Sequence, residues 1–283
     1  MKPKQIGFVD YKLDNWHANH FLHLLRDEPS FKSCGWMVTQ CWAMDGKGGR
    51  KWAAENKIQF TDNIEEMRAC DGIMILAPSN PETHLPLAKL VFPLGRPTYV
   101  DKTFAPSFKI AKQIFALADN HGVPVITTSA LRCAASLNKA VTELGKDKIR
   151  HVLTWGNGST FEEYIIHPLE MAIAVMGPGV RRVLRLRDGP HDQLLLQFAG
   201  GRSANVFLHS NCACERQAMI TSNEKSVHVN CQQDPFFHEL LRLIFRFFET
   251  GKESVPRKET LALFKVMDAA FDKRALGKFV KVS

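Results

Sequence analysis

Short apolar runs alternate with amphipathic stretches over the first 127 residues. The run at 72–77 is uniformly apolar, as expected for a strand covered on both faces. Apolar residues at 110, 111, 114, 115 and 118 follow a helical period. The same patterns predict strands at 6–9, 36–43, 72–77, 97–100 and 123–126, and helices from about 15 and over 52–55, 62–69, 81–91 and 107–121. Repeated strand–helix units predict a doubly wound, parallel, Rossmann-like sheet.

The pattern changes after residue 127. A strand-like run at 149–155 and a helical stretch at 161–176 are followed by short strand-like runs with tight turns between them. These runs are 180–187, 193–198, 203–208, 218–221 and 226–231, and two amphipathic helices, 237–248 and 258–273, complete the chain. The sequence therefore predicts an α/β architecture: a Rossmann-like domain over 1–127, then an α+β domain with an open antiparallel sheet over 128–283.

Composition and charge exclude several classes of protein. The chain has 283 residues, of which 45% are hydrophobic and 23% charged, typical of a globular protein. A net charge of +8 favours anionic ligands, but the basic residues form no run or motif typical of nucleic-acid binding. The sequence shows no secretory signal and no apolar run of membrane-spanning length. With seven cysteines and no C-x-x-C pair, we expect reduced thiols in a cytoplasmic protein that has no membrane partner.

Ligands of open α/β sheets bind at the carboxyl ends of the strands, so the loops at these ends are the first places to look. The first loop, 10–15, contains no glycine and begins with Asp10, where a dinucleotide-binding loop holds phosphate. Like charges about 4 Å apart cost roughly 4 kcal/mol at an effective dielectric near 20. Lys12 would offset part of this cost, and the helix beginning at Asn15 offers free amides.

Two further features carry candidate chemistry. Lys102 directly follows the strand at 97–100, where it would either face a substrate or pair with Asp101 in solvent. Glu163, His167 and Glu170 are spaced by four and three residues, so they share one helix face unless Pro168 bends the helix there. A histidine held by a carboxylate suits general-base work near neutral pH, although a surface Glu–His pair has the same spacing.

Three histidines, His17, His20 and His23, crowd the first predicted helix. We interpret them as part of a partly exposed helix face rather than as metal ligands. No metal site is predicted elsewhere in the chain.

Taken together, the order of these segments resembles the glucose–fructose oxidoreductase / inositol dehydrogenase / rhizopine catabolism family, known as Gfo/Idh/MocA. The segments that carry the resemblance are A-P-S-N-P-x-x-H at 77–84, V-D-K-T-F-A at 100–105, S-A-L-R at 129–132 and E-x-x-x-H-x-x-E at 163–170. The family's E-K-P is Asp101-Lys102-Thr103 here, its glycine fingerprint is missing, and Trp42 replaces the acid expected to hold the cofactor ribose.

The resemblance implies an NAD- or NADP-dependent oxidoreductase that acts on a secondary alcohol of a sugar or cyclitol. It implies that His167 accepts the hydroxyl proton, that Lys102 stabilises the developing alkoxide, and that Glu163 orients one of the reacting groups. These three residues and Glu170 would contact the substrate. The positions expected to contact the cofactor are Asp10, Lys12, Asn15, Trp42, Pro78, Ser79, Asn80, His84 and Asp101.

Two other functions stay open. The missing glycines favour a non-catalytic family member that binds a sugar or a protein partner. A metal-dependent sugar hydrolase or isomerase would use His167 and Glu170. In every case an exposed apolar sheet face is costly in water, and the resemblance also implies a homodimer or homotetramer through the C-terminal sheet.

Overall fold

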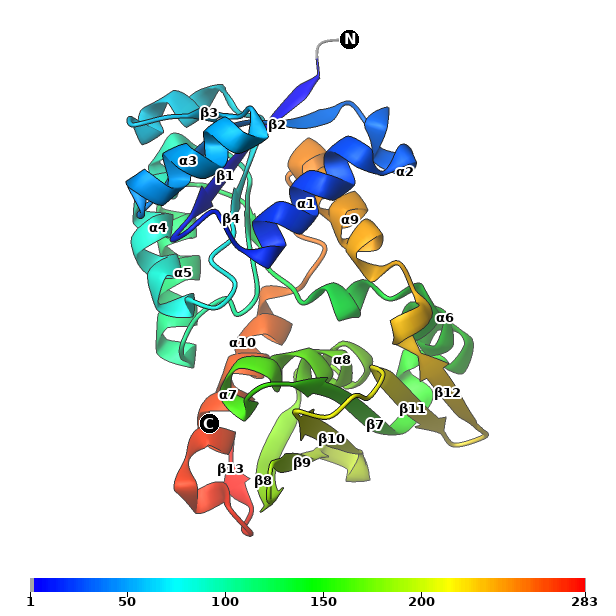
Figure 1. Ribbon diagram of the computed structural model, residues 1–283. Coiled ribbons are helices and arrows are strands. Elements are labelled where there is room, and N and C mark those ends of the chain that lie inside the picture. Colours follow the sequence, from blue (N-terminus) through cyan, green and yellow to red (C-terminus); the bar gives the residue numbers. More distant parts are fainter. Residues whose placement is uncertain (1–2, 283) are drawn as a thin grey trace. The chain divides into compact units, whose positions relative to one another are not determined.

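The computed structural model describes residues 3–282, which form two compact units (Figure 1). Among the described residues, the first unit contains 3–128 and 241–255, and the second contains 129–240 and 256–282. The sequence pattern predicts a single domain boundary, near residue 127. The structure differs at 241–255, which belong with the first unit although they come late in the chain.

The first unit is built on a six-stranded sheet in which every pair of neighbouring strands is parallel. Its strand order, β3-β2-β1-β4-β5-β6, is that of a doubly wound dinucleotide-binding sheet. The strands are β1 (Lys4–Asp10), β2 (Trp36–Ala43), β3 (Gln59–Phe60), β4 (Gly72–Ile75), β5 (Thr98–Val100) and β6 (Val125–Ile126). Ligands of such sheets bind where the chain reverses direction beside β1, which directs attention to the ends of β1, β4 and β5.

Helices of the first unit begin with side-chain caps at several positions. Asn15 caps α1 through Ala18 N, and Ser107 caps α5 through Ile110 N. The helices are α1 (Trp16–Asp27), α2 (Pro29–Lys32), α3 (Gly46–Asn56), α4 (His84–Val91) and α5 (Phe108–Asn120), with 3-10 turns η1 (Ile64–Ala69), η2 (Pro81–Thr83) and η3 (Phe92–Leu94). The sequence predicts only 52–55 of α3, because three glycines and Asp45 at its start are typical of a loop.

The distal part of α9 (Phe236–Thr250) packs on the first unit. Phe245 stacks on Trp36 with ring centroids 5.3 Å apart. A Cβ on Gly72 would lie 2.4 Å from Phe248, so only glycine allows the helix to come this close to β4. These contacts explain why 241–255 belong to the first unit.

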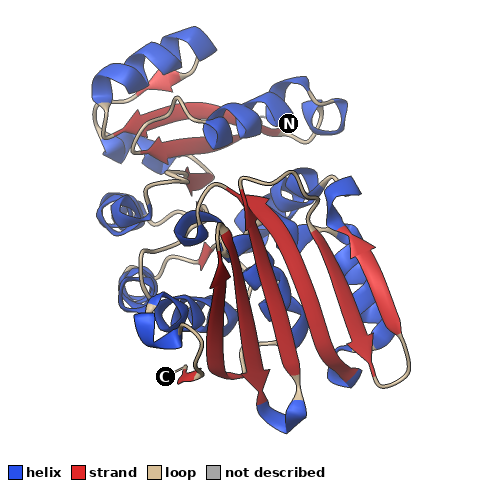
Figure 2. Ribbon diagram, turned by 60° about the horizontal axis from the view of Figure 1, so that its bottom comes forward, coloured by secondary structure: helices blue, strands red, loops and turns tan. Residues whose placement is uncertain are grey.

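The second unit contains a seven-stranded sheet, the broad sheet in Figure 2, with the order β12-β11-β7-β10-β9-β8-β13. All neighbours are antiparallel except β7 and β10, which are parallel, so the sheet is mixed where the sequence predicts an antiparallel meander. The strands are β7 (Ile149–Gly158), β8 (Val180–Asp188), β9 (His191–Phe198), β10 (Ser203–Ser210), β11 (Gln217–Ser222), β12 (Ser226–Asn230) and β13 (Val280–Lys281).

Helices cover one face of this sheet. α8 packs on β7 and β10, α10 packs on α8 and β8, and α6 packs on β11 and β12. The helices are α6 (Ala135–Leu144), α7 (Phe161–Tyr164), α8 (Ile166–Met176) and α10 (Arg257–Phe271), with 3-10 turns η4 (Ala130–Cys133), η5 (Lys146–Lys148), η6 (Ala199–Gly201), η7 (Cys231–Gln233) and η8 (Lys273–Ala275). Along the central strands, buried residues alternate with half-exposed ones, and the half-exposed side chains lie on the opposite face of the sheet.

The expected α/β fold, a Rossmann-like sheet followed by a second sheet with helices, is confirmed. The single predicted helix over 161–176 is two helices, α7 and α8, which meet at Ile165. Pro168 lies in the first turn of α8, where a backbone N–H has no helical acceptor to lose. The sequence correctly places the disturbance at this point.

Candidate functional site

Asp10 ends β1 and is almost fully buried, with 1% of its surface exposed. Its carboxylate accepts hydrogen bonds from Lys12 N at 3.1 Å and from Asn15 Nδ2 at 2.9 Å. Burial raises the pKa of Asp10 to about 6, and hydrogen bonds from Asn15 and from the backbone of Ala77, Lys12 and Tyr11 partly oppose this rise. The donors of the first loop are therefore directed at an acidic group of the protein itself.

Ala77, just beyond β4, adopts φ of +36°, a conformation that residues with a Cβ rarely take. Its backbone contributes one of the hydrogen bonds to Asp10. This unusual backbone lies at the edge of the sheet where ligands bind in doubly wound folds.

Whether this loop can hold a dinucleotide pyrophosphate depends on the protonation state of Asp10. An ionised Asp10 repels a phosphate by roughly 4 kcal/mol at about 4 Å and an effective dielectric near 20. Protonating a group of pKa about 6 costs only about 1.4 kcal/mol at pH 7. The protonated carboxyl is also a hydrogen-bond donor. Protonation of Asp10 would therefore remove the charge repulsion between this loop and a phosphate.

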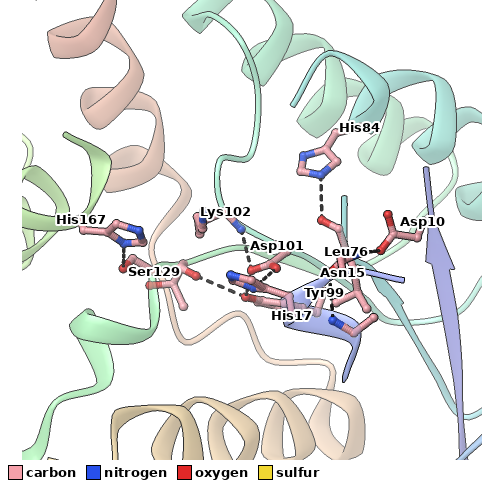
Figure 3. A network of polar contacts seen from close by, with 12 residues as sticks. Asp10, Asn15, His17, Leu76, His84, Tyr99, Asp101, Lys102, Ser129 and His167 are labelled. Atoms are coloured by element: carbon pink, nitrogen blue, oxygen red, sulfur yellow. Dashed lines mark hydrogen bonds and ion pairs between the residues drawn. The ribbon is translucent and has the colours of Figure 1, made fainter. Parts of the chain in front are cut away.

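Asp101, directly after β5, is held in a buried polar network (Figure 3). His17 Nδ1, from the first turn of α1, lies 2.5 Å from Asp101 Oδ2. Tyr99 OH and Lys102 N donate to Asp101 Oδ1 at 2.9 and 2.8 Å. Burial raises the pKa of Asp101, but the charges and hydrogen bonds of His17 and Lys102 outweigh it and leave the pKa below its usual value. Asp101 is thus an internal anchor between α1 and the end of β5.

Lys102 is 6% exposed, and the Lys102–Thr103 peptide bond is cis. Its backbone N–H donates to Asp101, so the lysine is not the solvated surface residue of the alternative interpretation. The network around Asp101 fixes the backbone from which the Lys102 side chain extends.

His84 lies at the start of α4 and is completely buried. Its Nδ1 is 3.1 Å from Phe104 O, and its Nε2 is 3.1 Å from Leu76 O. Burial lowers the pKa of His84, and the two carbonyls raise it in part. Both ring nitrogens face backbone carbonyls, so His84 ties the end of β4 to the loop after β5, and neither nitrogen is left to contact a cofactor.

The other residues expected to contact a cofactor lie at the same edge of the first sheet. Asn15 caps α1 and also binds Asp10, which links the helix start to the end of β1. Trp42 is half-exposed near the end of β2, beside Val9 of β1. Pro78, Ser79 and Asn80 follow β4, with Pro78 buried and Ser79 exposed.

In the second unit, Ser129 brings His167 and Glu170 together. Ser129 Oγ lies 2.8 Å from His167 Nδ1, and Ser129 N donates to Glu170 Oε2 at 2.8 Å. Figure 3 draws the contact between Ser129 and His167 as a dashed line. Arg132 lies 3.8 Å from Glu170 Oε1 and also pairs with Glu259 of α10. His167 and Glu170 therefore share a helix face, as the spacing predicts, and Glu170 binds the segment at 129–132.

Glu163 lies one turn before His167, at the end of α7, and is half-exposed. Its backbone N–H is capped by Thr160 Oγ1 at 3.4 Å. The next residue, Tyr164, has its ring centroid 6.0 Å from that of His167.

The sequence pattern gives Ser129 no role and places His17 on a partly exposed helix face. Ser129 stood only within the S-A-L-R segment, and nothing local indicates that its hydroxyl meets an imidazole 38 residues later. For His17 a signal was available, since it lies two residues after the helix cap at the ligand-binding edge of the sheet. His20, by contrast, stacks on Trp16, and His23 pairs with Asp27.

Over residues 3–282, no three His, Cys, Asp or Glu side chains gather in a way that would hold a metal ion. No helix in that same range is both long and apolar enough to cross a membrane.

The two units, in this order and with these sheets, show the two-domain α/β fold that the resemblance to Gfo/Idh/MocA oxidoreductases implies. No protein-family model matches the sequence, and the comparison with curated protein sequences also gave no match. The resemblance to this family therefore holds at the level of the fold.

Three solved structures illustrate this similarity in fold, each over nearly the whole chain. GenD2 from gentamicin A biosynthesis, in complex with NAD, has a TM-score of 0.80 and 15% identity, over 99% of this chain and 97% of its own. Myo-inositol 2-dehydrogenase from Lactobacillus plantarum has a TM-score of 0.79 and 15% identity, over 100% of both chains. Scyllo-inositol dehydrogenase from Lactobacillus casei has a TM-score of 0.80 and 12% identity, over 99% of this chain and 98% of its own.

Proposed function

We propose that the protein is a nicotinamide-dependent oxidoreductase that acts on a secondary alcohol of a sugar or cyclitol. The observation that carries this proposal is the fold, which over its whole length is shared with NAD-binding and inositol dehydrogenases. It is supported by a buried lysine at the end of β5 and a histidine held by Ser129 at the start of α8.

His167 takes the proton of the substrate hydroxyl in this proposal. When Nδ1–H donates to Ser129 Oγ, the lone pair of the imidazole lies on Nε2, which is then the nitrogen that accepts a proton. The Ser129 backbone, tied to Glu170 and through it to Arg132, keeps the serine in place. Ser129 is therefore a positioning residue, and His167 is the general base.

Lys102 stabilises the negative charge that develops on the substrate oxygen. An ammonium group removed from bulk water acts strongly on such a charge because the local dielectric is low. Asp101 and His17 keep the backbone of Lys102 in position. Glu163, one turn before His167, orients the hydroxyl or the imidazole in this proposal.

A bound NAD or NADP supplies the hydride acceptor at its nicotinamide ring. The residues proposed to hold it are the loop at 10–15, Trp42 and the segment at 78–80. His84 helps to hold this segment in place through its contacts with the carbonyl oxygens of Leu76 and Phe104. Asp10 must carry a proton for the pyrophosphate to enter the first loop.

Turnover of NAD⁺ and NADP⁺, followed by absorbance with a panel of polyols, inositols and sugar acids, tests the proposal. We expect reduction of one cofactor with at least one substrate. Lys102→Ala and His167→Ala should each lower kcat by about 10²-fold or more, the usual range for general acid–base groups, while circular dichroism stays unchanged. Undiminished turnover in both variants would exclude these roles.

One observation favours a second function. Asp10 occupies the place of a phosphate with well-formed hydrogen bonds, as expected of a chain that binds a sugar or protein without a cofactor. No binding of NADH or NADPH at millimolar concentration, at pH 6 as well as pH 8, would favour this alternative.

We also propose that the second sheet mediates self-association into a homodimer or homotetramer. Its half-exposed face carries the apolar side chains Leu153, Trp155, Leu195, Phe207 and Met219. Strand pairing makes them neighbours, since Phe207 lies opposite Trp155 and Met219 opposite Leu153. Contiguous apolar patches of this kind mark interaction surfaces.

A further inference from the structure

Arg216 lies beside the start of α8, in the loop that precedes β11. β11 runs antiparallel to β7 with Gln217 opposite Trp155, which brings Arg216 level with Gly156. A Cβ on Gly156 would lie 3.5 Å from Arg216 Cγ and 3.9 Å from Pro168 Cδ. Arg216 therefore lies on the helix-covered face of the sheet. There it is beside Gly156, as is Pro168, the residue that follows His167.

This guanidinium is half-buried without a counter-charge. Its Nη1 donates to Gln232 Oε1 at 3.0 Å, and within residues 3–282 no carboxylate forms an ion pair with it. Burial lowers the pKa of Arg216, while Cys214 and Tyr164 raise it only in part. A partly desolvated cation without an anion is costly, so an anionic ligand would be favoured here.

Tyr164 links Arg216 to His167. Its ring centroid lies 6.0 Å from that of His167, and its hydroxyl is close enough to Arg216 to influence the charge there. A Cβ on Gly158 would lie 2.2 Å from Tyr164 Cβ, so glycine at 158 is required for this approach. Tyr164, near the end of β7, thus lies next to the imidazole of His167 and interacts electrostatically with Arg216.

We propose that Arg216 binds an acidic group of the substrate, a carboxylate or a phosphate ester, next to the hydroxyl that His167 deprotonates. This inference rests on the proposed function and narrows its substrate class from neutral polyols to acidic sugars. Guanidinium groups bind both anions in a bidentate manner, and only one N–H of Arg216 is used by Gln232. The overall charge of +8 also favours acidic substrates.

Calorimetric binding to the full chain, without any cofactor, tests the inference. The ligands are glucuronate, gluconate and glucose 6-phosphate, with glucose and myo-inositol as neutral counterparts. Arg150→Gln is the matched control, because Arg150 lies in the same unit, is exposed, and donates to an amide oxygen, Asn223 Oδ1, at 2.8 Å. Arg216→Lys keeps the charge and provides a second variant if Arg216→Gln does not fold.

We expect at least one acidic sugar to bind more tightly than its neutral counterpart. Arg216→Gln should weaken that binding by about 10- to 100-fold, as for loss of a charged hydrogen-bond pair, and Arg216→Lys should weaken it less. The carboxylate and phosphate arms then tell which anion is preferred. Neutral sugars binding as well as acidic ones, no acidic sugar binding at tens of millimolar, or equal losses in Arg216→Gln and Arg150→Gln would each overturn the inference.

These outcomes are separate from those of the proposed function. Acidic sugars that bind through Arg216 but are never oxidised would contradict the oxidoreductase and leave the anion site standing. Oxidation of neutral polyols that is insensitive to Arg216→Gln would contradict the anion site alone.

Discussion

In the proposed function, Asp10 should make dinucleotide binding depend on pH in a way that a glycine-rich loop does not. Binding with Asp10 ionised costs roughly 4 kcal/mol in repulsion, whereas protonating it first costs about 2.7 kcal/mol at pH 8 for a pKa of about 6. Protonation is the cheaper route, so the affinity for NAD⁺ should fall about tenfold per pH unit above pH 6 and level off below it.

Replacing Asp10 with Asn removes this dependence. Asparagine is nearly isosteric with aspartate, and its oxygen can still accept from Lys12 N. Asn15 Nδ2 loses Asp10 as an acceptor but keeps its bond to Lys12 O at 2.6 Å, so the loop should keep its shape. Asp10→Asn should bind NAD⁺ about 100-fold more tightly than the wild type at pH 8 and within about threefold of it at pH 5.5. Asp14→Asn is the control, because Asp14 is exposed on the same loop and undergoes the same change of charge.

Titration calorimetry at pH 5.5, 6.5, 7.5 and 8.5, in buffers of different ionisation enthalpy, measures both affinity and proton uptake. We expect about one proton taken up per NAD⁺ bound by the wild type at pH 7.5, and none by Asp10→Asn. Pairwise equal affinities of the wild type and both variants at pH 8, or wild-type binding without proton uptake, would refute the proposed role of Asp10.

Other predictions concern stability, positioning and assembly. Because the pKa of Asp10 is raised from 3.8 to about 6 on folding, ionisation destabilises the fold as pH rises through that window; Asp10→Asn should therefore be about 3 kcal/mol more stable than the wild type at pH 8, but not at pH 4, in urea denaturation. His17→Ala should cost about 3–5 kcal/mol in the same assay, because it leaves Asp101 charged and buried without its partner, and adding Asp101→Asn should restore part of that loss. Ser129→Ala should lower kcat by about tenfold or more with little change in KM and should shift the pH profile of kcat, since the His167 tautomer is no longer held; an unchanged profile would argue against positioning. Phe207→Glu should turn an oligomer into a monomer in light scattering, and an unchanged mass would exclude this sheet face as the interface.

Local patterns predicted much of the fold. The uniformly apolar run at 72–77 marked β4 because both faces of that strand are covered, and the short strand-like runs separated by turns marked β8 to β11. The parallel pairing of β7 with β10 was not predictable in this way, since strand direction within a sheet depends on residues far apart in the chain. The apolar face of the amphipathic helix α9 indicates that one side of the helix is buried. It does not indicate that residues 241–255 pack on the first unit.

The sequence predicted several residues of the candidate site but not the hydrogen-bond and ion-pair partners of those residues. Asp10 stood out because the loop lacks glycine, and Glu170 and His167 share a face as their spacing requires. The partners that determine their chemistry come from distant segments: Ser129 for His167, Arg132 for Glu170, and His17 for Asp101. No periodicity encodes such pairs, because they arise only when the loops at the strand ends meet.

The central claim is that Lys102 and His167 act on the same substrate hydroxyl, and a double-mutant cycle on turnover tests it directly. The cycle compares kcat of the wild type with that of Lys102→Met, His167→Asn and the double variant, using whichever cofactor and substrate the panel identifies. Groups that act as a unit give non-additive losses. We predict that the double variant is hardly slower than the slower single variant. Losses that multiply as if independent, or wild-type turnover in either single variant, would contradict the account.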